Sequence, residues 1–451
     1  MDLHACLADQ RRYRRQIEKL HEKHLETGRL YELRQSEVSL ASFVVNSAKV
    51  ARLLAEAVAG GHYRLGPARI RTIRANGKER TVFAYRLTDL IVHGVVAGIL
   101  EEASTPQLSP GLHSYRKGAS WWTATAAFAA YVRAHTRSRP DVRTRGLYVL
   151  RRDVDSYTDS IPVGDRSPAW GMLRDALESG GVPVAPAHWP LVESIVRPEA
   201  FVRRREPFTQ YRGVPTGQPI SCVLFNLYLA DLDAQLYRTP GAFYARYCDD
   251  FVFAHPDADV ARVADVRIRQ TLRSLSLALN ESKTRNLYLT GAGRPSAPAA
   301  EFKGTTMVPF LGCLVSAQGT VSLSRQKRRR LLADLRHRAL RTARAIGAVD
   351  ADEVGSVVCS VVNRALSPRL EPSQQRSAGW LRRIVTDRRH LKQLDYSIAR
   401  IVLEALEGHR GARAFRRVPY RKMRLDWKLI SLLHARNRWS RGRRPLAEGV
   451  A

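Results

Sequence analysis

One short segment constrains the fold more than any other, because residues 247–253 have the sequence YCDDFVF. It places two adjacent carboxylates, Asp249 and Asp250, between apolar residues. We expect a strand hairpin whose flanks are buried and whose turn holds the Asp pair. Neighbouring carboxylates repel each other unless a cation joins them. Mg²⁺ takes oxygen ligands, so the pair predicts a metal site, although a turn in which Asp is simply favoured has the same pattern.

A second acidic cluster lies upstream, where an apolar run over residues 146–154 ends in carboxylates. It begins at Asp153, and residues 153–161 have the sequence DVDSYTDSI. A carboxylate at the end of one strand can meet another from an adjacent hairpin, and the two can bridge metal ions about 4 Å apart. Such a site suits transfer of a nucleotide to a primer 3′-hydroxyl, because phosphoryl transfer needs mainly positioning and charge neutralisation. An acidic helix cap is the alternative interpretation.

A third segment connects these clusters, and its residues 213–233 have the sequence GVPTGQPISCVLFNLYLADLD. The Gly/Pro turn predicts a loop that leads into a helix with one apolar face. Such a turn exposes backbone N–H groups and the side chain of Gln218, which suit a base, a sugar or a phosphate. An ordinary connection between a loop and a helix would have the same pattern.

The charge of the chain indicates a polyanionic partner. Among 451 residues, 74 are Lys or Arg and 42 are Asp or Glu, for a formal net charge of +32. Two segments concentrate this charge: residues 325–345 hold nine basic residues against one acid, and residues 410–444 hold thirteen against one. Nucleic acid is the natural partner, because each neutralised phosphate releases a counterion. A ribosomal-type protein, a membrane-surface protein and simply solvated helices are the alternatives.

Cysteine usage and hydropathy indicate the cellular compartment of the protein. The five cysteines are scattered and form no CxxC, which favours free thiols in a reducing compartment. No apolar stretch reaches transmembrane length, and the polar N-terminus lacks the apolar core of a signal peptide. We therefore expect a soluble cytoplasmic protein that does not contact a membrane.

Local patterns predict an α+β fold with three parts. Two alternating runs flank Asn76-Gly77, a strong hairpin signal. Ser324 is expected to cap the first of several basic helices, and the composition shift there marks a boundary. The predicted parts are an N-terminal helical extension (1–60), a mixed catalytic part (61–323) and a basic helical part (324–451). The individual elements expected are strands at 69–74, 78–85 and 146–154, a strand pair within 243–254, and helices over 38–58, 88–103, 121–135 and 259–278.

Taken in order, these segments resemble the conserved blocks of reverse transcriptases, most closely the bacterial retroelement kind, which includes defence-associated, retron-like and group II intron-like enzymes. The resemblance covers roughly residues 65–325 and rests on several ordered blocks rather than on one motif. Three blocks carry the catalytic motifs: the first-aspartate block corresponds to 153–161, the GxPQGxxxSP block to 213–226 and the YxDD block to 247–250. The others flank them: the LxLxxxKT block corresponds to 277–284, the primer-gripping hairpin to 310–312 and an upstream SYGFRPGRS-like block to 113–120.

The resemblance implies a right-hand polymerase, with fingers and a palm built on antiparallel sheet, followed by a basic helical thumb and C-terminal domain. It also implies a metal centre with two Mg²⁺, for which Mn²⁺ can substitute. Asp153 and Asp249 would bind both ions, Asp250 would support them, and the carbonyl of Val154 would complete the shell. Lys283 would be the general acid for pyrophosphate, with a surface ion pair as its alternative role.

The resemblance further implies residues that contact the nucleotide or the template. Four basic residues are candidates in the fingers, and five residues belong to the two blocks that would shape the nucleotide pocket. These candidates are Arg69, Lys78, Arg80 and Arg116 in the fingers, and Tyr157, Thr158, Gly217, Gln218 and Asn226 in the pocket.

Three departures from the family pattern bear on function. Thr158, beside Tyr157, stands where the family usually has an aromatic residue that excludes the ribose 2′-hydroxyl, so ribonucleotide use is left open. Thr216 replaces the common Gln of the PQG turn, and Cys222 replaces the common Pro. No CxxC-bearing endonuclease segment is present, which argues against a full mobile-intron protein.

We therefore expect an RNA-directed DNA polymerase that copies a dedicated non-coding RNA in a bacterial antiviral defence system. Its partners would be an RNA template, a DNA primer or product, and dNTPs, with the oligomeric state left open. A non-catalytic, maturase-like RNA-binding protein is one alternative, although the intact Asp153, Asp249 and Asp250 argue against it. A template-independent or protein-primed DNA polymerase is another, and Thr158 keeps an RNA-dependent RNA polymerase open.

Overall fold

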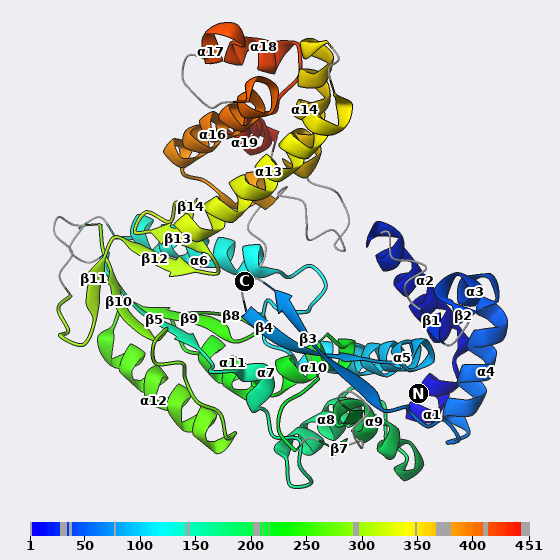
Figure 1. The fold of residues 1–451 in the computed structure, drawn as a ribbon. Coiled ribbons are helices and arrows are strands. Elements are labelled where there is room, and N and C mark those ends of the chain that lie inside the picture. The colour runs from blue at the N-terminus through cyan, green and yellow to red at the C-terminus, as the bar shows by residue number, and fades with distance from the viewer. Residues whose placement is uncertain are drawn as a thin grey trace. The chain divides into compact units, whose positions relative to one another are not determined.

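The structure is a computed structural model of the chain, shown as a ribbon in Figure 1. Two sequence features of interest, Asn76-Gly77 and Thr216, lie outside the residues it describes. The described residues are 2–27, 34–35, 38–75, 78–139, 141, 145–201, 208–209, 211–215, 217–291, 297–347, 350–366, 380–408 and 414–442.

The chain forms two compact units, each built from two separate stretches of sequence. Strands β5 (Leu147–Asp153) and β10 (Arg285–Leu289) run from one unit into the other. The units differ from the linear division predicted at residues 60 and 323, because helix α6 (Trp121–Arg137) packs on the much later strand β13 (Cys313–Ser316). The first unit contains Met1–Ser120 and Val149–Asn286, and the second contains Trp121–Tyr148 and Leu287–Ala451.

The first unit begins with short and long helices that pack on one another. The single helix predicted over 38–58 is wrong in one respect, because the structure has two helices that meet at Asn46. The Asn46 side chain donates a hydrogen bond to the Ser42 carbonyl (3.0 Å), and such local bonds compete with a continuous helix. The elements are α1 (Leu3–Ala8), α2 (Gln10–Thr27), β1 (Arg34–Gln35), β2 (Val38–Ser39), α3 (Leu40–Val45) and α4 (Ser47–Ala59).

A four-stranded sheet of order β4-β3-β6-β7 follows in the first unit. Strands β3 (Ala68–Ala75) and β4 (Lys78–Ala84) pair antiparallel from Arg69↔Ala84 to Ala75↔Lys78, so the predicted basic hairpin is confirmed. Strand β6 (Glu199–Phe201) pairs parallel to β3, and β7 (Phe208–Thr209) pairs antiparallel to β6.

Helix α5 (Leu87–Ser104) is the buried centre of the first unit and confirms the helix predicted over 88–103. It carries no charged residue between Leu90 and Leu100 and is buried on nearly all sides, as expected of a helix apolar all round. The helices that contact it include α8 and α10. The neighbouring helices are η1 (Thr105–Gln107), α8 (Pro168–Ser179), η3 (Pro186–His188), α9 (Trp189–Val196) and α10 (Pro219–Leu227).

A five-stranded sheet has the order β11-β10-β5-β9-β8 and places β5 in the middle. Its apolar run Leu147–Leu150 is buried at every position, which explains why the sequence shows no alternation there. The predicted strand pair within 243–254 is confirmed as an antiparallel hairpin. The remaining elements are β8 (Phe243–Tyr247), β9 (Asp250–His255), β11 (Lys303–Thr305), α7 (Tyr157–Ser160) and α11 (Ala230–Tyr237).

Helix α12 (Ala258–Ser274) packs on β9 and ends four residues before the predicted position 278. The chain leaves the helix because Ser276 adopts a left-handed backbone conformation (φ 57°). The following residues then run beside the end of β5, where the Asp155 N–H donates to the Ala278 carbonyl (2.8 Å). The early end of the helix therefore supplies a backbone partner for the acidic cluster.

The second unit contains a three-stranded antiparallel sheet, β12-β13-β14, on which α6 packs. Strands β12 (Met307–Phe310) and β13 are joined by Leu311 and Gly312, both with positive φ (49° and 76°). Two such residues are typical of the tight hairpin turns that match strand twist. The short hairpin predicted at 310–312 is therefore present, and β14 (Val321–Leu323) completes the sheet.

Helices, most of them basic, follow in the second unit, as predicted. Ser324 caps α13 (Arg325–Ile346), because its hydroxyl accepts a hydrogen bond from the Lys327 N–H (3.2 Å). Helix α13 packs against both α14 and α16. The other helices are α14 (Ala351–Leu366), α15 (Leu381–Ile384), α16 (Arg388–Glu407), α17 (Ala414–Arg417), α18 (Tyr420–Leu425) and α19 (Leu432–Gly442).

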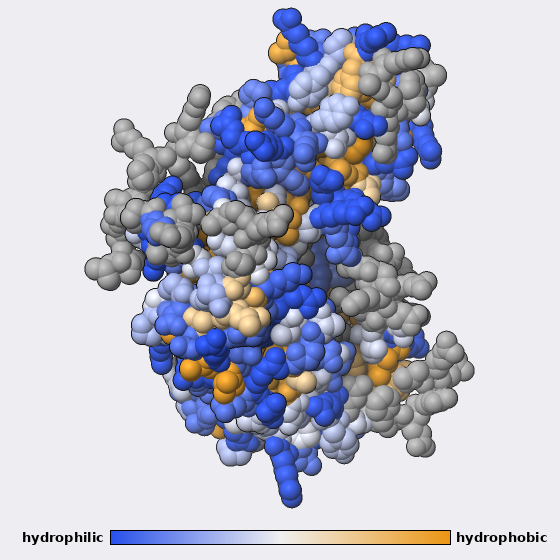
Figure 2. Space-filling view, turned by 90° about the vertical axis from the view of Figure 1, so that its left-hand side faces the viewer, coloured by the Kyte–Doolittle hydropathy of each residue, from blue (hydrophilic) through white to orange (hydrophobic). Residues whose placement is uncertain are grey.

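The described elements confirm an α+β protein with a helical C-terminal region. Across the described part of the chain, every helix is too short or too polar to cross a membrane. Hydrophilic residues occupy most of the coloured surface in Figure 2, with smaller hydrophobic patches between them.

Candidate active site

The β8–β9 hairpin presents the YCDD segment at its turn. Tyr247 and Asp250 form the last pair of the hairpin, which leaves Cys248 and Asp249 as the turn. Cys248 has φ 58°, a conformation that side chains rarely adopt and that surrounding structure must support. Asp249 is thereby fixed at the tip, and Asp250 begins the buried strand β9.

The end of β5 lies beside this tip, so the structure brings the two predicted carboxylate clusters together. Strand β5 neighbours β9 in the sheet and ends at Asp153. The Val154 N–H donates to the Asp249 carbonyl (3.0 Å), which ties the two segments by backbone. Burial and the charge of Asp153 raise the pKa of the Asp249 carboxyl. The charge of Asp153 therefore lies close enough to disfavour ionisation of Asp249.

Lys283 forms an ion pair with Asp153. Its Nζ donates to both carboxylate oxygens of Asp153, at 2.8 and 2.9 Å. The backbone positions it, because the Asn280 N–H donates to the Asp153 carbonyl (2.8 Å). Partial burial opposes the charge of Lys283, but its hydrogen bonds to Asp153 and the nearby carboxylates raise its pKa overall. The side chain of Lys283 is 46% exposed, so solvent screens this pair.

Asp250 is partly buried beside Arg151, whose guanidinium lies 3.1 Å from its Oδ2. Its Oδ1 is buried and has no hydrogen-bond partner among the described residues. Burial raises the pKa of Asp250 to about 6 despite the opposing charge of Arg151. Buried polar atoms without a partner are rare in folded proteins. Among the described residues, Arg151 and Lys283 therefore leave part of the site's carboxylate oxygen without a positively charged partner.

These donors fit Mg²⁺. The carboxylates of Asp153 and Asp249 and the backbone at Val154 offer oxygen alone, which hard divalent ions prefer. The described residues contain no cluster of three or more His, Cys, Asp or Glu side chains arranged as a metal cage.

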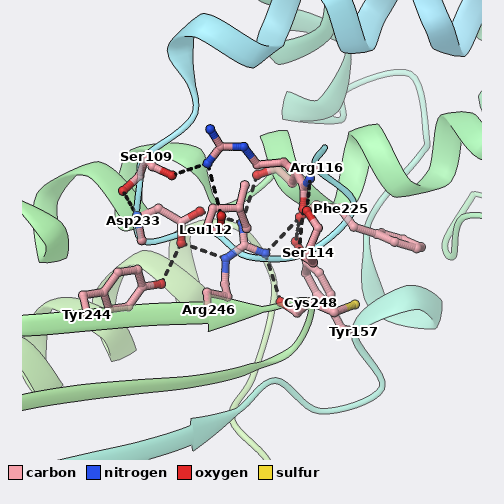
Figure 3. A network of polar contacts seen from close by, with 12 residues as sticks. Ser109, Leu112, Ser114, Arg116, Tyr157, Phe225, Asp233, Tyr244, Arg246 and Cys248 are labelled. Atoms are coloured by element: carbon pink, nitrogen blue, oxygen red, sulfur yellow. Dashed lines mark hydrogen bonds and ion pairs between the residues drawn. The ribbon is translucent and has the colours of Figure 1, made fainter. Parts of the chain in front are cut away.

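A fully buried ion pair joins strand β8 of the hairpin to helix α11, and the sequence analysis does not predict it (Figure 3). Arg246 and Asp233 are both 0% exposed, with Nη2 of Arg246 2.6 Å from Oδ2 of Asp233. The Tyr244 hydroxyl also donates to Asp233 (2.6 Å). A charge buried this deeply is tolerated only when it is paired and hydrogen-bonded. The signal in the sequence is a lone Arg within the strand FYARY.

Arg246 links the YCDD turn to helix α10 (Figure 3). Its Nη1 donates to the carbonyls of Cys248 (2.9 Å) and Phe225 (3.2 Å), and its Nη2 donates to the Asn226 carbonyl (3.0 Å). One guanidinium therefore holds the left-handed Cys248 in place while satisfying the C-terminal carbonyls of the helix. This explains how the strained turn persists.

The upstream block at 113–120 packs against the same hairpin. The His113 N–H donates to the Arg246 carbonyl (2.8 Å). Ser114 and Asn226 are joined twice, from the Ser114 hydroxyl to the Asn226 side-chain oxygen and from the Asn226 amide nitrogen to the Ser114 carbonyl, each 2.9 Å. Arg116 donates to the Ser109 carbonyl (2.7 Å). The side chain of Asn226 and one nitrogen of Arg116 are thus engaged in holding this loop.

Four of the predicted pocket residues occupy different environments. Tyr157 is buried and donates its hydroxyl to the Phe225 carbonyl (2.7 Å). Thr158 is half-buried, and its carbonyl accepts from the Val214 N–H (2.9 Å). Gly217 is exposed with φ 96°, a conformation that favours glycine. Gln218 is only 3% exposed and lies beside His93, whose pKa burial lowers to about 4.

Three of the four predicted fingers residues lie on the β3–β4 hairpin, in a different sheet from the carboxylates, whereas Arg116 lies in the loop at 113–120. Arg69 is exposed, with its guanidinium carbon 5.9 Å from the ring centre of Phe201. Lys78 and Arg80 lie in β4, opposite Ala75 and Ile73. Their side chains lie outside what the structure describes.

The carboxylates at the end of β5 and in the adjacent YCDD turn, with a third Asp and a Lys beside them, form the kind of acidic cluster that two-metal nucleotidyl transfer uses. The family comparison agrees. Residues 182–315 match the family described as "Reverse transcriptase (RNA-dependent DNA polymerase)", and this region includes Asp249, Asp250 and Lys283 but not Asp153. This stretch of the chain is therefore similar to the reverse transcriptase family.

Solved structures similar to the chain include yeast telomerases. Apo telomerase from Candida tropicalis is 11% identical with a TM-score of 0.44, covering 83% of this chain and 63% of that chain. Telomerase from Candida albicans, solved with a fragment of telomeric RNA, is 10% identical with a TM-score of 0.42, covering 84% and 65%. The chain thus spans less than two thirds of either telomerase. No curated protein matches it.

Proposed function

We propose that this chain is an RNA-directed DNA polymerase whose Asp153 and Asp249 hold two Mg²⁺. The observation that carries the proposal is the backbone bond from Val154 to the Asp249 carbonyl, which sets the end of β5 beside the YCDD turn. Two bound Mg²⁺ would supply activation of a primer hydroxyl and neutralisation of phosphate charge. The family match over residues 182–315 supports the same activity.

The chain's own residues have distinct roles in this proposal. Asp153 and Asp249 fix the metal positions, and the Val154 carbonyl adds an oxygen donor. Asp250 supports the pair from the buried start of β9, where Arg151 orients one of its oxygens. Lys283 reaches Asp153 and is the candidate that protonates the leaving pyrophosphate. Arg246 holds the turn that carries Asp249 and takes no part in the chemistry.

The sugar preference is proposed to depend on Thr158. Tyr157 is the adjacent aromatic, but its hydroxyl is bonded to the Phe225 carbonyl within the core. Tyr157 therefore does not act as the aromatic residue that excludes a ribose 2′-hydroxyl. A Thr at the neighbouring position supports weaker discrimination between dNTPs and NTPs than an aromatic residue would give.

The biological setting is proposed as a bacterial retroelement-type enzyme that copies a dedicated non-coding RNA during antiviral defence in the cytoplasm. The departures at Thr216 and Cys222 and the basic helices after residue 324 support this setting. The proposed partners are the template RNA, a DNA primer or product, and dNTPs.

Primer extension on an RNA template with Mg²⁺ tests the proposed activity. The native protein is compared with Asp249→Asn and with the matched control Asp259→Asn, an exposed carboxylate on α12. We expect DNA synthesis by the native protein and the control, and none by Asp249→Asn. If the native protein copies neither this template nor the RNA that co-purifies with it, the chain is a non-catalytic RNA-binding scaffold. DNA attached covalently to the protein would indicate protein priming.

A further inference from the structure

A cavity of about 390 Å³ lies within the second unit, far along the chain from the carboxylates. It is formed by residues of α16, α17, α18 and α19 and of the turn before α19. This volume is within the range of roughly 300–1,000 Å³ that small-molecule sites occupy. Its lining includes the aromatic residues Tyr396, Phe415 and Tyr420 and the polar residues Asp395, Ser431 and His434.

The walls of this cavity are aromatic. The rings of Tyr396 and Phe415 are stacked, with centres 5.8 Å apart and planes inclined by 18°. Tyr396 is 51% exposed and Tyr420 is 37% exposed, so both rings reach solvent at the opening. Single exposed aromatic residues are common, but three that converge on one cavity offer flat faces to a planar ligand.

The polar groups at the base are fixed in place. Asp395 accepts from the Leu432 N–H (2.7 Å) and from the Ser431 hydroxyl (2.7 Å), which caps the start of α19. Ser431 Oγ is also 3.0 Å from Nδ1 of His434. The Tyr420 hydroxyl lies beside Ser431, and burial raises the pKa of Tyr420. These bonds hold Ser431 and His434 in place, so the cavity is preformed and its exposed lining is mainly apolar.

The surroundings of the cavity are strongly basic. Residues 410–444, which contribute Phe415, Tyr420 and His434, hold thirteen Lys and Arg against one acid. Lys392 lines the cavity, and the guanidinium carbon of Arg400 is 5.8 Å from the ring centre of Tyr396. At the top of Figure 2, hydrophilic residues lie beside hydrophobic patches. A ligand that suits this surface is anionic and carries a flat aromatic group.

We propose that this cavity takes an unpaired nucleobase of a bound RNA strand. The base would stack on Tyr396, and the flanking phosphates would contact Lys392 and the neighbouring arginines. Stacking on aromatic side chains tolerates any base, whereas a base held in a duplex cannot enter the cavity. The inference rests on the proposed function only in taking RNA as the partner, and it adds a site that prefers single strands to duplexes.

The test measures binding, with no polymerisation, in the Asp249→Asn background. The probes are a 12-nucleotide oligo(A) RNA and a blunt RNA duplex of the same length. Tyr396→Ala is expected to weaken single-strand binding by about 5- to 100-fold, the effect of losing one stacked base. Duplex binding should stay within twofold, and Tyr396→Phe should retain single-strand affinity. The matched control is Tyr237→Ala, which removes an equally exposed tyrosine from the first unit.

Three outcomes would overturn the proposal: no single-strand binding by the parent protein, an equal loss for both probes in Tyr396→Ala, or no loss for either. An equal loss would mean that the surface acts by charge alone. Because Tyr396 is half exposed, its removal should leave thermal unfolding unchanged, and a shifted melting temperature would direct the test to Phe415→Leu instead. Loss of single-strand affinity in a protein that never extends a primer would retain the cavity and reject the polymerase.

Discussion

Two hairpins of the first unit, β8–β9 and β3–β4, differ in the contacts that hold them in place. The β8–β9 hairpin carries the carboxylates, and its strands, its turn and the arginine beneath it are buried or bonded from several sides. The β3–β4 hairpin carries basic residues, and where its side chains are described, Arg69 and Arg71 are exposed. Metal ligands must be fixed to a fraction of an ångström, whereas side chains that attract a polyanion act over longer distances.

The largest effect is expected from removing the proposed metal ligand Asp153, at the end of strand β5 beside the β8–β9 hairpin. Asp153→Asn keeps the shape of the side chain but removes its charge, so we expect the rate of primer extension to fall by more than about a hundredfold. Steady-state rates at saturating primer–template measure this effect. A rate within tenfold of the native value would show that Asp153 is not a ligand.

Removal of the buried cation should have the next largest effect. Arg246→Met leaves Asp233 charged and unpaired in the core, which is expected to lower the free energy of unfolding by about 3–5 kcal/mol. Urea denaturation measures the change. The control is Arg338→Met, which breaks the exposed pair with Asp334 and should cost under about 1 kcal/mol. Equal losses in the two variants would contradict the distinction between buried and exposed pairs.

Substitution of Lys283 tests whether its ion pair with Asp153 has a chemical role. If Lys283 protonates pyrophosphate, Lys283→Met should slow single-turnover nucleotide addition by roughly a hundredfold. The control Lys49→Met removes an exposed lysine from α4 and should leave the rate unchanged. A normal rate in Lys283→Met, with a small loss of stability, would reduce Lys283 to a surface ion pair.

The exposed hairpin should give the smallest effect. Arg69→Ala should change the free energy of unfolding by less than about 0.5 kcal/mol, because the side chain is exposed. If Arg69 contacts a phosphate, the variant should also lower the slope of log affinity against log salt by about 1. Binding of RNA across a salt series measures the slope, with Arg52→Ala on α4 as the control. An unchanged slope would remove Arg69 from the nucleic-acid surface.

The same contrast explains how much of the structure could be predicted from the sequence. The hairpin around 76–77, the helix over 88–103 and the cap at Ser324 depend on local patterns, and the structure confirms them. The meeting of Asp153 with the YCDD turn could be expected because a strand end and a hairpin tip can share one edge of a sheet. These features need only neighbours in sequence or a simple strand arrangement.

Other features depend on contacts that no local pattern reveals. The buried pair of Arg246 and Asp233 joins two elements, and an Arg in a strand ordinarily indicates an exposed position. Asn226 was assigned to the nucleotide pocket, but its amide also holds Ser114. The end of α12 near Ser276 follows from the need to pair the next residues with the end of β5. In each case tertiary packing outweighs the local preference.

The most direct test of the account is metal binding without turnover. Electron paramagnetic resonance during a Mn²⁺ titration counts the bound ions. The samples contain a saturating non-hydrolysable dNTP and a dideoxy-terminated primer on RNA. The proteins compared are the native protein, Asp153→Asn, Asp249→Asn and the control Asp259→Asn. We expect two tightly bound ions in the native protein and the control, and fewer in both active-site variants. Equal binding in all four proteins would contradict the assignment of Asp153 and Asp249 as the metal ligands.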